Sequence, residues 1–303
     1  MARLQLIKGG EPVGMGLADY IWLDDNGLLL FKKKSILIGK DDKGNPVPLL
    51  DRWTYEYGEP DDDQTQTRVL SPYFYLPDPT RPQPNYLVPC EVRDAEDHCV
   101  EINWRAKLRL AIDDRGKMTN LVWFGFEQEY LLTEAGTKEE DGYEARRFNT
   151  SERHLGACFD AGLLIHSAWN PPANSQPWDF KIGYRGFPQD LDPDPPNALI
   201  VADHLILARY LMEKIGGSKG LVPEWGNLSI FVSTPALREP GGNHLAEATR
   251  MAEALSPLGK IRHIPHPTHG GHQCLQVNRD TPHDPYKLAY DVLLAVWPLD
   301  STE

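Results

Sequence analysis

The stretch WFGFEQEYLL, residues 123–132, places two carboxylates in an otherwise apolar run. In a β-strand, residues two positions apart share a face, so Glu127 and Glu129 are expected side by side, with the aromatic residues on the other face. Two like charges this close raise one pKa unless a cation lies between them, and Mg²⁺ and Mn²⁺ take oxygen ligands of this kind. The spacing therefore indicates either a divalent-cation site or the solvated polar face of an edge strand.

A third carboxylate lies in the segment TSERHLGACFDAGLLI, residues 150–165, whose apolar residues recur at helical spacing after a Thr-Ser cap. Glu152 is expected in the first turn of this helix, leaning toward Leu155 and Phe159 of the apolar stripe. A carboxylate there can favour the helix dipole or ligate a metal, and both interpretations stay open.

A second candidate cluster is the segment RHIPHPTHGGHQC, in which four histidines recur at a spacing of three: His263, His266, His269 and His272. An extended polyproline-like segment has three residues per turn and would align them on one side. Imidazoles suit Zn, Cu, Ni or Fe better than Mg, so this segment is either part of a transition-metal site or an exposed loop without metal.

These residues must be positioned by strands and helices. The segment 18–31, ADYIWLDDNGLLLF, has two apolar runs around an Asn-Gly turn and predicts a β-hairpin. Residues 84–93 predict another strand, whereas 40–83 and 185–197, rich in Pro and Asp, predict loops. Residues 197–217 predict a helix that ends at Gly-Gly. PWDFKIGY and LSIFVST predict strands, and the alternation of strands and helices after residue 95 predicts an α+β domain.

Composition limits the function classes. A formal net charge of −13 over 303 residues argues against a nucleic-acid partner. No apolar run has the length of a membrane span or signal peptide, so a cytoplasmic protein is expected. The four cysteines lack CxxC spacing and are expected to be reduced structural thiols.

Taken together, these motifs resemble the glutamine synthetase family, in particular its eukaryote-type branch. WFGFEQEYLL resembles the family's Glu-x-Glu metal strand, and SERHLGACFDAGLLI the helix that carries another metal glutamate. PWDFKIG resembles Trp-Glu-Phe-Gln-Ile-Gly, ADHLILAR resembles Gly-Asp-His-Leu-x-x-Ala-Arg, and STPALREPGG resembles Ser-Thr-Lys-x-Met-Arg-x-x-Gly-Gly. ADYIWLDDNGLLLFKKK and YLVPCEV match strands of the family's small N-terminal domain.

The resemblance implies a fold and a set of roles. The expected fold is α+β: a β-grasp-like domain over residues 1–94, then a glutamine synthetase-type catalytic domain over 95–303, with helices packed on a curved antiparallel sheet. Catalytic roles are implied for Glu56, in a loop reaching a neighbouring subunit, and for Asn227. The resemblance further implies metal ligation by Glu127, Glu129 and Glu152 and substrate contacts by Trp225, Gly226 and Ser229.

Departures from the family pattern are as informative as the matches. NPPANSQPW lacks a further metal glutamate before Trp178, and WGNLSIFVST has Ser229 near the place of a metal-binding His. RHIPH has Pro265 where the family has a substrate-binding Arg, and AYDVLLAVWPL replaces a strand that supplies phosphate-binding arginines. The sequence printed here ends before the family's last metal Glu, so ATP use is doubtful.

Three functions follow from this mixture. The first is a divergent metal-dependent, amide-forming carboxylate–amine ligase of a specialised pathway, with an amino-acid-like substrate other than that of glutamine synthesis. It would use Mg or Mn. The second is an ATP-independent metalloenzyme in which the spaced histidines complete the Glu-x-Glu site and bind Zn, Fe or Cu. The third is a non-catalytic homologue that acts through assembly. The resemblance favours the ligase and implies a homo-oligomeric ring such as a decamer.

Overall fold

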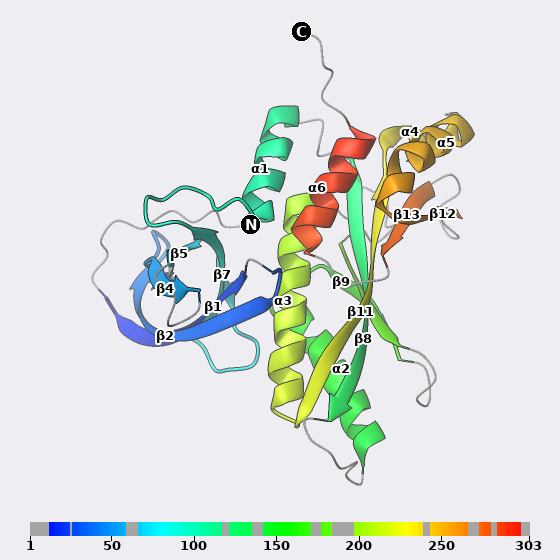
Figure 1. Cartoon of the computed structure of the whole chain (residues 1–303). Coiled ribbons are helices and arrows are strands. Elements are labelled where there is room, and N and C mark those ends of the chain that lie inside the picture. The colour runs from blue at the N-terminus through cyan, green and yellow to red at the C-terminus, as the bar shows by residue number, and fades with distance from the viewer. Residues whose placement is uncertain are drawn as a thin grey trace. The chain divides into compact units, whose positions relative to one another are not determined.

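The computed structural model describes residues 12–24, 26–58, 66–116, 121–134, 142–170, 177–183, 197–238, 243–265, 273–279 and 284–297. The chain divides into two compact units (Figure 1). Unit 1 comprises residues 1–106 and 160–162, and unit 2 comprises 107–159 and 163–303. Helix α1 (Trp104–Arg115) begins in unit 1 and ends in unit 2, so the boundary expected at 94/95 lies inside unit 1.

Unit 1 contains a seven-stranded sheet in the order β3-β2-β1-β7-β5-β4, with β6 paired to β7. β1 and β7 are parallel, and the other neighbouring strands are antiparallel. The strands are β1 (Gly14–Leu23), β2 (Leu29–Lys40), β3 (Pro46–Leu49), β4 (Trp53–Tyr57), β5 (Gln66–Pro72), β6 (Leu76–Pro77) and β7 (Asn85–Arg93).

The predicted hairpin and the predicted strand at 84–93 are confirmed by β1–β2 and β7. The turn between β1 and β2 is held by Asp24, whose Oδ1 accepts hydrogen bonds from the backbone N–H groups of Asn26 and Leu28. The predicted loop over 40–83 is wrong, because β3 to β6 lie within it. β5 gains its hydrogen bonds from β4 and β7, and this pairing with two neighbouring strands overrides the loop-like composition.

Alternate residues of the unit 1 strands form its core. Side chains of β1, β2, β5 and β7 pack together and bury their apolar surface, which is the main stabilising term for a sheet of this kind. The buried core residues are Ala18, Tyr20, Trp22, Ile36, Ile38, Leu70, Tyr86, Val88, Cys90, Val92 and Val100.

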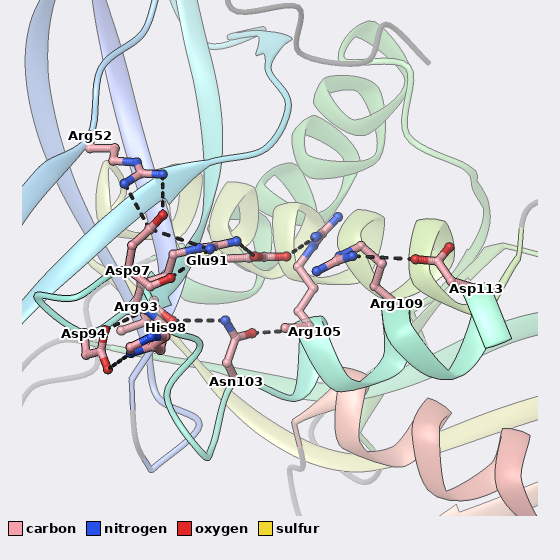
Figure 2. Close-up of polar contacts among 12 residues, drawn as sticks. Arg52, Glu91, Arg93, Asp94, Asp97, His98, Asn103, Arg105, Arg109 and Asp113 are labelled. Atoms are coloured by element: carbon pink, nitrogen blue, oxygen red, sulfur yellow. Dashed lines mark hydrogen bonds and ion pairs between the residues drawn. The ribbon is translucent and has the colours of Figure 1, made fainter.

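A buried carboxylate attaches the start of α1 to β7 (Figure 2). Glu91 accepts hydrogen bonds from Arg105 at 2.6 Å and from Arg93 at 3.1 Å. Asn103 Nδ2 donates to the carbonyl of Val92 at 3.0 Å, next to this pair. Because Glu91 is only 5% exposed, both arginines offset the cost of burying its charge.

Unit 2 contains a six-stranded antiparallel sheet in the order β12-β13-β11-β8-β10-β9. Its strands are β8 (Trp123–Glu134), β9 (Ile165–Trp169), β10 (Trp178–Gly183), β11 (Leu221–Ser233), β12 (Lys260–Pro265) and β13 (Gln273–Arg279). Its helices are α2 (Tyr143–Asp160), α3 (Ala198–Gly217), α4 (Pro235–Arg238), α5 (His244–Leu255) and α6 (Pro285–Val296), and a 3₁₀ turn follows α5 at Ser256–Leu258.

Helix α3 contacts β8, β10 and β11, α5 contacts β12 and β13, and α6 packs beside α3 and α5 (Figure 1). The predicted helix at 197–217 is confirmed, with Asn197 as its N-cap. The strands predicted from PWDFKIGY and LSIFVST are confirmed by β10 and β11. The loop predicted at 185–197 lies outside the described residues except for its last residue. Helix α2 begins at Tyr143, seven residues before the predicted start at 150.

Two further expectations can be compared with the structure. All four cysteines are free thiols, as predicted. Across the residues that the structure describes, no helix is long and apolar enough to cross a membrane. The strand order of unit 2 and the helices that pack on its sheet confirm the expected α+β fold, with helices on a curved antiparallel sheet.

Candidate functional site

The candidate site lies on the face of the unit 2 sheet that carries Glu127 and Glu129, here called the polar face. Phe126 and Gln128 alternate with the two glutamates along β8 and point to the other face of the sheet. They are buried, with 1% and 0% of their surface exposed. The predicted alternation is therefore confirmed. β8 lies between β10 and β11, so the interpretation as an edge strand is wrong.

Strand register aligns Glu127 with a lysine and a serine. Its direct partner on β10 is Lys181 and its direct partner on β11 is Ser229. Lys181 Nζ lies 2.7 Å from Glu127 Oε2, with 38% and 18% of these side chains exposed. The same ammonium lies 5.9 Å from the ring centroid of Phe231 on β11. The lysine side chain therefore extends across β8 and neutralises Glu127.

Glu129 has a third carboxylate as its cross-strand partner, Asp179 of β10. Direct partners place their Cβ atoms about 5 Å apart, so these two acids repel. Burial, reinforced by the charges of Glu127 and Glu129, raises the pKa of Asp179 to about 6, although Lys181 opposes the rise. Burial, followed in size by the charge of Glu127, also raises the pKa of Glu129. The polar face therefore holds a carboxylate pair whose negative charge is only partly compensated.

A β-bulge in β11 shapes the wall beside Glu129. The register of β11 against β8 shifts between Trp225 and Leu228, which leaves Gly226 and Asn227 opposite Glu129. A Cβ added to Gly226 would lie 3.3 Å from the Cβ of Glu129, so glycine permits this close approach. Hydrogen bonds from the backbone and side chain of Asn227 act to lower the pKa of Glu129.

The bulge is held from the core side by Gln128. Its Nε2 donates to the carbonyls of Gly226 and Asn227, both at 3.3 Å. Its Oε1 accepts from Arg209 Nε of α3 at 2.9 Å, and a second guanidinium nitrogen of Arg209 donates to the same oxygen. Burial lowers the pKa of Arg209 to about 10, which leaves it charged at neutral pH. A buried charge thus fixes the backbone that lines the site.

The residues do not fit the metal set implied by the resemblance. Glu127 is already paired with Lys181. Glu152 is exposed in the middle of α2, not in its first turn, because α2 starts earlier than predicted. Phe159, predicted to share its stripe, is 52% exposed. Within the described ranges, no group of three or more His, Cys, Asp or Glu side chains is arranged to hold a metal ion.

Two other predicted residues lie on the opposite side of the sheet. His263 pairs with Leu275, and Leu275 pairs with the buried Val232, so His263 belongs to the side covered by helices. Its Nε2 lies 2.6 Å from Gln273 Oε1. The Trp225 indole donates to Glu213 of α3 at 3.3 Å. The structure therefore brings Gly226, Asn227 and Ser229 to the glutamates but does not bring His263 or Trp225 there.

The remaining predicted residues are placed as follows. Glu56 lies exposed on β4 of unit 1, where the hydroxyl of Thr67 donates to it at 3.2 Å, so it is on a strand and not in the expected loop. The expected histidines at 266, 269 and 272 lie outside the described residues.

The α3 motif ADHLILAR serves the core of unit 2. Asp203 accepts a hydrogen bond from the Tyr286 hydroxyl at 2.8 Å, and His204 Nδ1 accepts one from the backbone N–H of Leu164 at 3.0 Å. His154 of α2 donates through Nε2 to the carbonyl of Ala208 at 2.9 Å. Both histidines are buried and bonded to the backbone.

Sequence reasoning missed two residues of the site, Asp179 and Lys181. A usable signal was present, because in PWDFKIG both alternate with the apolar Trp178, Phe180 and Ile182 and therefore share a face. Register, which the sequence alone does not supply, places that face beside Glu127 and Glu129.

The chain is similar to glutamine synthetases in sequence and to a glutamine synthase homolog in structure. No family model matches the chain. The chain is 27% identical to chloroplastic glutamine synthetase of Chlamydomonas reinhardtii, over 86% of this chain and 74% of that protein. It is 25% identical to the chloroplastic/mitochondrial glutamine synthetase of Arabidopsis thaliana, over 75% of this chain and 56% of the relative, so it spans little more than half of that protein. It is 27% identical to glutamine synthetase of Cricetulus griseus, over 82% of this chain and 72% of that protein.

A crystal structure described as a novel glutamine synthase homolog superposes on the chain with a TM-score of 0.60 and 14% identity. The match covers 98% of this chain and 83% of that one, which supports the fold.

Proposed function

From the premise that this chain is a divergent homologue of the eukaryotic glutamine synthetases, we propose that it is an amide-forming ligase that joins a carboxylate to an amine. The observation that carries the proposal is the Glu129–Asp179 pair, two carboxylates in direct register on the polar face. An amine arrives as an ammonium ion, and a partly buried pair of acids attracts such a cation and orients it.

The other end of the polar face is basic. On β12, Lys260 pairs with Asn278 and Arg262 pairs with Gln276, and Asn278 in turn pairs with Ser229. Lys260 and Arg262 therefore share the face of Glu127, three strand spacings away, or about 15 Å. This arrangement supports a substrate pair in which an anionic carboxylate or phosphate lies near β12 and the amine lies near β8 and β10.

The roles follow from charge. Glu129 and Asp179 would hold the amine and accept the proton that it loses when it attacks a carbonyl. Lys260 and Arg262 would bind the anionic partner. ATP, if used, would activate the carboxylate by supplying a phosphate leaving group. We propose a substrate other than that of glutamine synthesis, because several family residues for phosphate and substrate binding are replaced in this sequence.

The test combines binding and turnover. The full chain is incubated with ATP, Mg²⁺, a panel of amino-acid-like carboxylates and amines, and phosphate release and amide products are measured by coupled assay and mass spectrometry. Asp179→Asn and Glu129→Gln should each lower kcat/KM by about 10²-fold or more. Glu253→Gln, at an exposed position of α5, is the matched control. Absence of ATP binding by calorimetry, together with absence of product, contradicts the ligase.

A second candidate is a non-catalytic homologue that acts through assembly, and the Lys181–Glu127 ion pair favours it because that pair occupies a predicted metal position. We also propose that the chain assembles as a homo-oligomer, as the family resemblance implies. Mass photometry of the purified protein tests this, and a monomer at micromolar concentration would contradict it. A metalloenzyme that uses His263 with the glutamates is not supported, because they lie on opposite faces of the sheet.

A further inference from the structure

We propose that the ammonium group of Lys181 is the resident cation of the polar face and that it excludes a divalent metal from Glu127. The inference concerns the same face as the proposed function, but it holds whether or not the chain is catalytic.

Geometry gives the ammonium a built position. Lys181 is the direct cross-strand partner of Glu127, and its Nζ lies 2.7 Å from Oε2, a charge-assisted hydrogen-bond distance. The ring of Phe231 lies 5.9 Å from the same nitrogen on the far side of β8. The direct partner of Phe231 on the intervening strand β8 is Gly125, which has no side chain to block the lysine. The ammonium is thus fixed from two neighbouring strands.

Partial burial strengthens the Lys181–Glu127 pair and so disfavours a divalent metal at Glu127. With 18% of its side chain exposed, Glu127 lies where Coulomb attraction is less screened than at the surface. A divalent metal would have to displace the ammonium or lie beside it, and two cations close together repel strongly. Ser229, on the other side of Glu127, offers a neutral hydroxyl rather than a further charged ligand. The neighbouring Glu129 and Asp179 are then left for a cationic ligand such as an amine.

The experiment measures Mn²⁺ binding to the full chain by electron paramagnetic resonance, without ATP or substrate, so that loss of catalysis does not affect the outcome. Lys181→Gln should bind Mn²⁺ at least about ten-fold more tightly than the wild type. The double variant Lys181→Gln/Glu127→Gln should lose that gain, which separates this site from Mn²⁺ bound elsewhere. Lys181→Arg keeps the positive charge and should bind no more Mn²⁺ than the wild type.

Two outcomes overturn the proposal. One is equal Mn²⁺ affinity for Lys181→Gln and the wild type when both are folded by circular dichroism. The other is a loss of wild-type Mn²⁺ binding in Glu127→Gln, because the proposal requires Glu127 to be occupied already. The comparison of Glu127→Gln with the wild type does not need Lys181→Gln, so it still tests the proposal if Lys181→Gln does not fold. Failure of the ligase assay with success here would leave the non-catalytic homologue as the function.

Discussion

At the scale of single residues, titratable side chains in unit 2 are stabilised in two different ways. On the polar face, Glu127 is met by an opposite charge, the ammonium of Lys181. In the core, His154 and His204 are kept neutral and bonded to the backbone. Burial lowers the pKa of each histidine to about 4. The first arrangement compensates a charge on the polar face, whereas the second makes the fold sensitive to acid.

The acid sensitivity gives a prediction for His154. Its pKa is about 6.5 in the unfolded chain and about 4 in the folded one, so between these values only the unfolded chain takes up the proton. Its contribution is fully present above pH 6.5 and is lost as pH falls toward 4, by about 3 kcal/mol at most. His154→Gln should therefore flatten the pH dependence of the unfolding free energy in urea between pH 6.5 and 4. His263→Gln, at an exposed position of β12, is the control. A wild-type slope retained in His154→Gln would disprove the assignment.

At the scale of elements, the position of β10 depends on its last residue, Gly183. Its φ is +97°, and a Cβ there would lie 2.5 Å from Val201 Cγ1 and 2.8 Å from the carbonyl oxygen of Phe124. Gly183→Ala should cost about 2–5 kcal/mol, because it adds backbone strain and a clash with a neighbouring strand. Gly220→Ala is the matched control: its φ is +70° with nothing within 4 Å, and its expected cost is about 1–2 kcal/mol. Chemical denaturation measures both, and equal costs would show that crowding at β10 is unimportant.

The sequence predicted elements better than the contacts between them. Strong local signals gave the β1–β2 hairpin and α3, because an Asn-Gly turn and a Gly-Gly helix end act within a few residues. The β4–β5 pairing was missed, because both strands lie in a stretch of loop-like composition that carries no clear strand pattern. The two acids of β8 were predicted to share a face, but their cation was predicted as a metal. Lys181 could not be assigned to Glu127 without the register of β10.

At the scale of the whole molecule, each unit has its own core and an arginine that pairs with buried polar groups of that core. In unit 1, Arg81 lies 3.0 Å from Asp19 and 3.2 Å from Asp78, and both carboxylates are fully buried. In unit 2, Arg209 holds Gln128. Since these two networks stabilise different cores, we expect the units to unfold in separate steps.

Variants of the two arginines test that expectation. Arg81→Met removes the cation facing two buried acids and should destabilise unit 1 by about 3–5 kcal/mol. Arg209→Met leaves a buried amide oxygen without its charged donor and should destabilise unit 2 by about 1–3 kcal/mol. Arg52→Met, at an ion pair with 55% and 44% exposed side chains, should change either unit by less than about 1 kcal/mol. Hydrogen exchange read by mass spectrometry assigns each loss of protection to its unit. Loss of protection in both units from either variant would instead show that the chain unfolds as a single cooperative body.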